Sequence, residues 1–209
     1  MLLYPFKDVL GKELPEHLAP GSAAALRLVG DWTRSFLMSD HPELGREGNV
    51  CPFTSMAARI DTLRFGISEA TSNEPARIRS ELVQAFDRLD QIPHPREMDT
   101  HRAVLVGFPN CDNVSGLATL AKVQKSLRLF SFRRARMIGL FHQHTEEPGL
   151  WNPKFRPLRS PLPVIAVRSL VLQDAAFVMR HPLLAPAYLV NFPLAGTRQL
   201  AARVLLQRS

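Results

Sequence analysis

The chain has little cysteine and no long apolar run, and both absences exclude whole classes of protein. Its 209 residues include two cysteines, Cys51 and Cys111, which lie far apart in the sequence. This number excludes a disulfide framework and a four-cysteine zinc site. No apolar run approaches the roughly 18 residues that a transmembrane helix needs, and the first residues do not resemble a signal peptide. We therefore expect a soluble, cytoplasmic protein that does not act in a membrane.

Several binding and catalytic motifs are also absent. The sequence contains no Walker loop, no Gly-x-Gly-x-x-Gly and no Ser-His-Asp order, which argues against P-loop, dinucleotide-binding and hydrolase functions. It has no recognition helix, zinc finger or RNP-type aromatic motif, so we expect no specific nucleic-acid binding. The net charge of +7 nevertheless suggests an anionic partner, such as a phosphate, a carboxylate metabolite or the propionates of a porphyrin.

The periodicity predicts an α+β fold with a sheet of about four strands covered by helices. The length and an apolar content of 45% suit a single domain, so we expect an N-terminal arm over 1–21 and one domain over 22–209. Alternating or apolar patterns predict strands at 62–69, 101–108, 137–142 and 163–171. Helical patterns occur at 22–38, where Ser22 could be the cap, and at 73–89, 112–129 and 197–207. The sequence leaves the strand directions open.

The segment between the last two predicted strands, residues 143–162, most strongly suggests a function. It is rich in proline, carboxylates and arginine, and it contains Trp151, Phe155 and Leu158. Structureless loops longer than about 12–15 residues are usually functional or disordered. The apolar residues and prolines predict that this loop is ordered and packed. Ordered loops on a scaffold often carry binding and catalytic residues.

Two histidines stand at the start of this loop. If the strand continues, His142 and His144 lie on one face and Phe141 on the other. Two imidazoles at this spacing, followed by Glu147, permit a non-haem iron or zinc site. His142 alone could instead be an axial ligand of haem iron. For both histidines, hydrogen bonding at the rim of the core remains the structural alternative.

A second candidate ligand is Cys51, which precedes a proline. If a short helix begins near 54–58, Cys51 lies at its cap, where the orphan N–H groups and the helix dipole favour a thiolate. Cys51 is then a candidate metal ligand or nucleophile, and it competes with His142 as the axial ligand of a haem. The alternative is a buried cysteine that acts as a small hydrophobic residue.

Two arginines of the loop, Arg156 and Arg159, lie between prolines that fix the backbone. The planar guanidinium suits bidentate binding of a carboxylate, either a haem propionate or a substrate. Trp151 and Asn152, together with Arg156, form the predicted substrate-binding set. Alternatively, the arginines bind backbone carbonyls and hold the loop to the domain.

Six lysines and arginines between 122 and 136 form a basic face. Most such runs are solvated surfaces. The alternative is a site for an anion or a partner protein. In that case the protein would be a non-catalytic binding module.

Two blocks of sequence resemble a known family. They are His-Pro-Glu-Leu-Gly-Arg-Glu-Gly-Asn-Val-Cys-Pro-Phe at 41–53 and Gly-Leu-Trp-Asn-Pro-Lys-Phe-Arg-Pro-Leu-Arg-Ser-Pro at 149–161, with Phe141-His142 between them. Together they resemble a largely uncharacterised bacterial family whose members often lie in specialised-metabolite clusters. The arrangement is more distantly similar to the YqcI/YcgG-like proteins, some of which are haem-dependent enzymes that oxidise amino-acid nitrogens.

The resemblance implies a haem pocket and an N-oxygenation. Cys51, His142, Asn152, Arg156 and Arg159 match motif positions. We therefore expect an oxidoreductase, a haem-binding monooxygenase that acts on a small amino-acid-like substrate in a specialised-metabolite pathway. Such an enzyme needs an electron donor, and it could form a homodimer. The non-haem metal enzyme and the non-catalytic binding module remain as alternatives.

Overall fold

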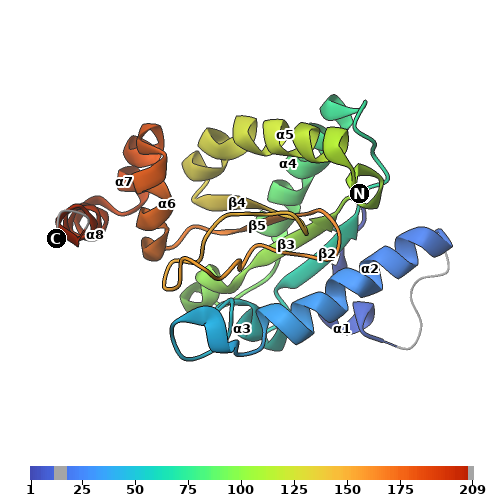
Figure 1. Ribbon diagram of the computed structural model, residues 1–209, viewed down its shortest axis with the longest axis horizontal. Coiled ribbons are helices and arrows are strands. Elements are labelled where there is room, and N and C mark those ends of the chain that lie inside the picture. The colour runs from blue at the N-terminus through green and yellow to red at the C-terminus, as the bar shows by residue number, and fades with distance from the viewer. Residues whose placement is uncertain (12–17, 207–209) are drawn as a thin grey trace.

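The computed structural model describes residues 1–11 and 18–206, and it contains one five-stranded mixed sheet with helices on both faces (Figure 1). The strands are β1 Tyr4–Pro5, β2 Leu63–Ile67, β3 Ala103–Gly107, β4 Arg136–Phe141 and β5 Val164–Ser169, in the order β1-β2-β3-β5-β4. Only the β2–β3 pair is parallel. The α+β prediction and its four strands are confirmed. The strand that was missed, β1, has two residues, one of them proline, and so carries no periodicity.

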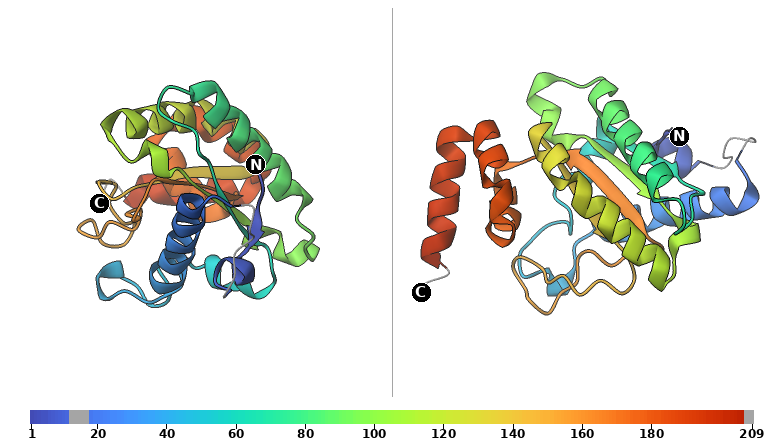
Figure 2. Two further views of the ribbon diagram at one scale, coloured as in Figure 1. Left: turned by 90° about the vertical axis from the view of Figure 1, so that its right-hand side faces the viewer. Right: turned by 90° about the horizontal axis from the view of Figure 1, so that it is seen from above.

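The helices form two layers and a separate C-terminal group. They are α1 Phe6–Val9, α2 Pro20–Trp32, α3 Thr54–Arg59, α4 Pro75–Gln91, α5 Val114–Arg133, α6 Ala175–Arg180, α7 Ala185–Asn191 and α8 Pro193–Leu206. Helices α4 and α5 cover one face of the sheet, whereas α1, α2 and α3 lie on the other (Figures 1 and 2). Within the described ranges, no helix is both long and apolar enough to cross a membrane.

Most predicted helices are present with shifted ends. The pattern at 22–38 corresponds to α2 and its extension, but Ser22 is not the cap, because the helix begins at Pro20. Proline suits the first turn, where its missing N–H has no intrahelical partner. The hydroxyl of Ser22 instead donates to Glu69 at 2.7 Å. The patterns at 73–89 and 112–129 correspond to α4 and α5, and the pattern at 197–207 falls within α8 except for Gln207, which lies outside the described residues.

Helix α2 continues into a π-helix, Thr33–Leu37, a rare form that is often found at functional sites. The carbonyl of Leu37 accepts hydrogen bonds from the Cys51 N–H at 2.9 Å and from the Thr54 hydroxyl at 3.4 Å. The prediction that Cys51 caps the following helix is wrong, because α3 begins at Thr54 and Phe53 precedes it. The backbone of Cys51 is anchored to the end of α2 instead.

The two faces of the sheet have separate cores. Alternate residues of the central strands, among them Ile138, Ile165 and Val167, pack against α4 and α5. The residues between them belong to the core on the side of α2, which includes Leu105 and Val164. This alternation follows from the two-residue period of a strand, and it decides which candidate site residues can meet.

The two ends of the chain join the domain in different ways. Residues 1–11 contain β1 and α1, and Val9 is fully buried in the core beside α2. The predicted arm over 1–21 therefore contributes to the core, and its residues 12–17 lie outside the described residues. Helices α6 to α8 form a third, smaller core against Phe132 of α5. They stand at one end of the molecule (Figure 1).

Candidate functional site

The loop over residues 142–162 is held by its own arginines. Arg156 donates through Nε to Glu146 at 3.1 Å and through Nη1 to the Pro153 carbonyl at 2.6 Å. Arg159 donates to Glu146 at 2.8 Å and to the Thr145 carbonyl at 3.2 Å. The hydrogen bonds from Arg156 and Arg159 lower the pKa of Glu146. These contacts favour the structural reading, in which the two arginines hold the loop.

The two sequence blocks of the resemblance pack against each other. The side chain of Asn152 donates to the Glu43 carbonyl at 2.8 Å. Gly45 adopts φ +78°, and a methyl group placed on it would lie 3.0 Å from the backbone of Trp151. Only glycine adopts this conformation without strain. Asn152 therefore has a structural partner, and the Trp151 side chain remains 65% exposed.

Aromatic rings connect the loop to α2. Trp32 packs edge-on against Phe141 with ring centroids 5.6 Å apart, and its indole N–H donates to the Arg159 carbonyl at 3.1 Å. Phe36 of the π-helix contacts Phe155 of the loop at 6.1 Å. These contacts confirm the prediction that the loop is ordered and packed.

His142 does not lie in a strand, so the continuation of the strand through the two histidines is not observed. Strand β4 ends at Phe141, and the Thr145 N–H donates to the His142 carbonyl at 3.1 Å, which closes a turn. Burial lowers the pKa of His142, and His144 lowers it further, against an opposing effect of Asp112. The His142 Nε2 lies 3.4 Å from the Thr145 hydroxyl, and its Nδ1 is buried without a hydrogen-bond partner among the described residues.

The predicted non-haem metal site is not assembled. Among the described residues, no group of three or more His, Cys, Asp or Glu side chains is placed to hold a metal ion. His144 is exposed, and Glu147 pairs with Arg180 at 3.0 Å. The structure therefore does not bring His142, His144 and Glu147 together, because the chain turns where an extended strand was expected.

The basic face at 122–136 is partly neutralised within the fold. Arg134 pairs with Asp87 at 2.7 Å, and Arg136 pairs with Asp90 at 2.7 Å. Arg128 lies 5.2 Å from the Phe177 ring. Half of the six cations thus have internal partners, and this surface is less suited to an external anion than its sequence suggests.

On the α2 side, the part of the sheet that includes the edge strand β4 is incompletely covered. Gly139 of β4 and Ala166 of β5 are direct partners, and both are partly exposed, as is Ala103 of β3. Strand β5 lies between β3 and β4, so the exposure of Ala166 does not arise from a sheet edge. A methyl group placed on Gly139 would meet only the Phe141 ring, at 3.6 Å, among the described residues. We call the surface formed by Ala103, Gly139 and Ala166 the open face.

A cation and a thiol stand beside the open face. Arg168 projects from β5 on the same side as Ala166, and its guanidinium lies 5.6 Å from the centre of the Phe53 ring. Asp174 accepts from both Arg168 Nη atoms, at 2.9 and 2.6 Å. Burial alone lowers the pKa of Arg168, but Asp174 and, less strongly, Cys51 raise it overall. Cys51 is partly exposed and packs against the core on this side.

The two predicted axial ligands lie in different parts of the structure. Cys51 packs against the core on the side of α2, next to the open face, whereas His142 lies beyond the end of β4, in the turn closed by Thr145. Sequence reasoning missed Arg168 and Asp174. Two features of the sequence could have indicated them: a single arginine in an otherwise apolar strand, and the small residues that form the open face.

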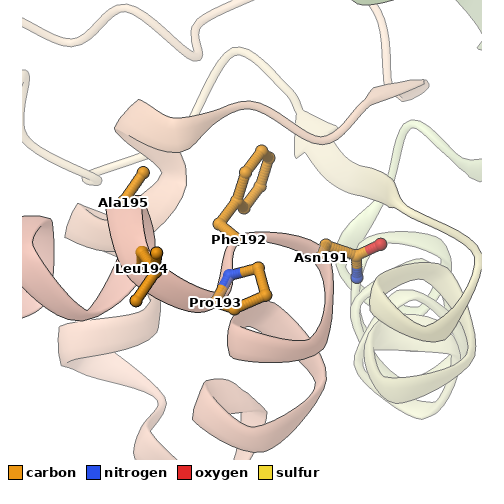
Figure 3. Close-up of a pocket in the computed structure, with 5 residues that line it drawn as sticks. All are labelled: Asn191, Phe192, Pro193, Leu194 and Ala195. Atoms are coloured by element: carbon orange, nitrogen blue, oxygen red, sulfur yellow. The ribbon is translucent and has the colours of Figure 1, made fainter.

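One shallow cavity of about 380 Å³ can be set aside. It is lined by Asn191, Phe192, Pro193, Leu194 and Ala195, at the turn between α7 and α8 (Figure 3). These residues are consecutive and include no ionisable side chain. The cavity therefore offers neither a charge nor a metal ligand, and none of the predicted site residues lines it.

A family model with the description "Domain of unknown function (DUF6875)" matches residues 26–203. The match includes both sequence blocks, the loop and the residues of the open face. A search of curated proteins and a search of solved structures each found no match. Since the matched region spans most of the 209 residues, the chain belongs to the DUF6875 family.

Proposed function

We propose that the protein is a haem-dependent oxidoreductase that binds haem on the open face. The observation that carries the proposal is the partly exposed surface of small residues on β3, β5 and β4, on the opposite face from the buried Ile138, Ile165 and Val167. Glycine inside a strand often marks a place where a ligand approaches the backbone closely. A surface of glycine and alanine is also flat, which suits a planar ring.

The residues around the open face fit a porphyrin. Phe53 and Phe141 supply apolar contacts, as most cofactor sites do. Arg168 supplies a positive charge for a propionate, and Asp174 holds its guanidinium in a fixed orientation. Cys51 supplies a thiol, which ligates haem iron in some oxygenases. Bound haem would supply the oxygen chemistry that protein side chains lack.

Cys51 is a better candidate for the axial ligand than His142. It lies on the side of the sheet where the surface is open, and its backbone is fixed by the Leu37 carbonyl. Burial lowers the pKa of His142, and this favours the neutral form that a metal requires. However, His142 lies beyond the end of β4, in the turn closed by Thr145, and not on the strands that form the open face. The ligand proposed first from the sequence is therefore replaced by the second.

The reaction follows from the resemblance described above. We propose N-oxygenation of a small amino-acid-like substrate in a specialised-metabolite pathway, located in the cytoplasm and supplied by an electron donor. Arg168 is the cation placed to contact a carboxylate on the open face. Arg156 and Arg159 also pair with a carboxylate of the protein, Glu146, but they lie on the loop and not beside the open face.

Absorption spectra during titration with haem test this proposal. We expect a Soret band for the wild-type protein and the same band for His142→Ala. Cys51→Ala should shift the band and remove the red-shifted ferrous carbonyl spectrum that thiolate ligation produces. No Soret band for the wild-type protein would refute haem binding. A band that changes in His142→Ala and not in Cys51→Ala would identify His142 as the ligand and contradict the assignment to Cys51.

A further inference from the structure

A cavity of about 410 Å³ lies between the loop and the C-terminal helices. The loop contributes apolar residues, and α6 and α8 contribute the opposite wall; Figure 1 shows these segments. The lining residues are Pro148, Gly149, Leu150, Pro153, Ala176, Met179, Arg180 and Arg203. The volume lies within the range of roughly 300–1,000 Å³ typical of small-molecule sites. None of these residues belongs to the open face.

The polar part of the lining consists of two arginines. Arg203 reaches the cavity from α8, and its Nε is buried without a hydrogen-bond partner among the described residues. Such a group is destabilising, since a buried donor without a partner has lost its hydrogen bonds to water. Arg180 donates through Nη1 to Glu147 at 3.0 Å, and both side chains are exposed. Arg203 is therefore the cation of α8 that a carboxylate in the cavity would contact.

The surroundings of the cavity are positively charged. From Ala175 to the end of the chain, the sequence contains four arginines and no aspartate or glutamate. Arg128, on the neighbouring α5, also has a buried Nε without a partner among the described residues, and its Nη1 lies 3.1 Å from His181 Nε2. Burial, and then the charge of Arg128, lower the pKa of His181. This part of the molecule thus has cations and little acid to neutralise them.

We propose that this cavity binds a small apolar carboxylate. The carboxylate would accept hydrogen bonds from Arg203 and Arg180, because the planar guanidinium matches a carboxylate in two-point contacts. The apolar part would pack against Pro148, Leu150 and Met179. The inference is independent of haem binding, since it uses different residues and stands if the open face binds nothing.

Calorimetric titration of the full chain tests the site with three probes. Hexanoate combines a carboxylate with an apolar chain, hexanol has the chain alone, and inorganic phosphate has the charge alone. We expect hexanoate to bind the wild-type protein more tightly than either. Arg203→Gln should weaken hexanoate binding by about 10- to 100-fold, as expected for the loss of a hydrogen bond to a charged group.

Arg198→Gln is the matched control, because Arg198 is an exposed arginine on the same helix and does not line the cavity. It should bind hexanoate as the wild-type protein does. Leu150→Asp tests the opposite wall at a side chain that is 60% exposed, and it should also abolish binding through charge repulsion. Hexanol binding as tight as that of hexanoate would overturn the proposal. Equal losses in Arg198→Gln and Arg203→Gln, or phosphate binding as tight as that of hexanoate, would also overturn it.

Discussion

The two faces of the same three strands differ in what covers them. Toward α4 and α5, Ile138, Ile165 and Val167 are at most 1% exposed and form a continuous core. Toward α2, neighbouring positions of β4 and β5 hold Gly139 and Ala166, which remain partly exposed. A fold that needed only stability would fill both faces with large apolar side chains. Both faces carry a core, but on the α2 side the small residues of β4 and β5 leave part of the sheet uncovered.

The largest loss of stability should come from removing Asp174, the ion-pair partner of Arg168 beside the open face. Asp174 is 8% exposed in its side chain and binds both Nη atoms of Arg168. Asp174→Ala leaves Arg168 without this partner, so we expect the free energy of unfolding to fall by about 3–5 kcal/mol. Urea denaturation measures this value.

Glu146→Ala is the control for that substitution, because Glu146 also pairs with two arginines but is 71% exposed. Solvent screening makes exposed pairs weak, so Glu146→Ala should change the free energy of unfolding far less than Asp174→Ala does. Equal losses for the two carboxylates would show that Arg168 does not depend on Asp174. Burial would then make no difference to the contribution of these two ion pairs to stability.

Alanine substitutions at two adjacent residues of β4 should change the free energy of unfolding in opposite directions. Ile138 is 1% exposed in the closed core, and Ile138→Ala should lower the free energy of unfolding by about 2–5 kcal/mol. Gly139→Ala adds a methyl group where only the Phe141 ring lies within contact distance. Because glycine is less favourable than alanine inside a strand, we expect a gain of about 0.5–1 kcal/mol. Thermal and urea unfolding check both values, and a clear loss in Gly139→Ala would mean that the open face is filled.

The smallest effect concerns the pH dependence of stability that arises from His142. The pKa of His142 is lowered in the folded state, so the unfolded chain binds more protons as the pH falls below about 6.5. The contribution of His142 to stability is present above that pH and is lost below it. His142→Gln should reduce this acid sensitivity. The pKa of His181 is also lowered, so part of the acid sensitivity should persist in this variant. An unchanged pH profile of the melting temperature would contradict the assignment.

Much of the fold could be predicted from periodicity, and the errors have identifiable causes. The strands at 63–67, 103–107, 136–141 and 164–169 agree with their predicted ranges because their apolar patterns are strong. Local capping rules failed at Ser22, where Pro20 begins the helix, and at Cys51, where the backbone is bound by Leu37. The failure at Ser22 arises from a competing local signal, the proline two residues earlier, and the failure at Cys51 arises from a tertiary contact that the local sequence does not contain.

The candidate site was less predictable, because it depends on which residues share a face. The sequence correctly indicated an ordered loop and drew attention to Cys51. It assigned ligand-binding roles to Arg156 and Arg159, which the structure ties to Glu146. Conversely, the open face consists of small residues that carry no chemical signal on their own. Their importance follows from the register of β3, β5 and β4, which no single strand reveals.

The most direct test of the central claim is a haem titration of Gly139→Val, followed by its Soret absorbance. The substitution places a branched side chain on the open face, where a new methyl group meets only the Phe141 ring, so the protein should keep its wild-type circular dichroism. We predict that haem binding weakens by about 10-fold or more. In a closely fitted site, a misfit of a single methylene group already costs about 1–3 kcal/mol of binding free energy. Arg156→Gln, on the loop, should bind haem normally. Wild-type haem affinity in a folded Gly139→Val variant would contradict the claim that the open face is the cofactor site.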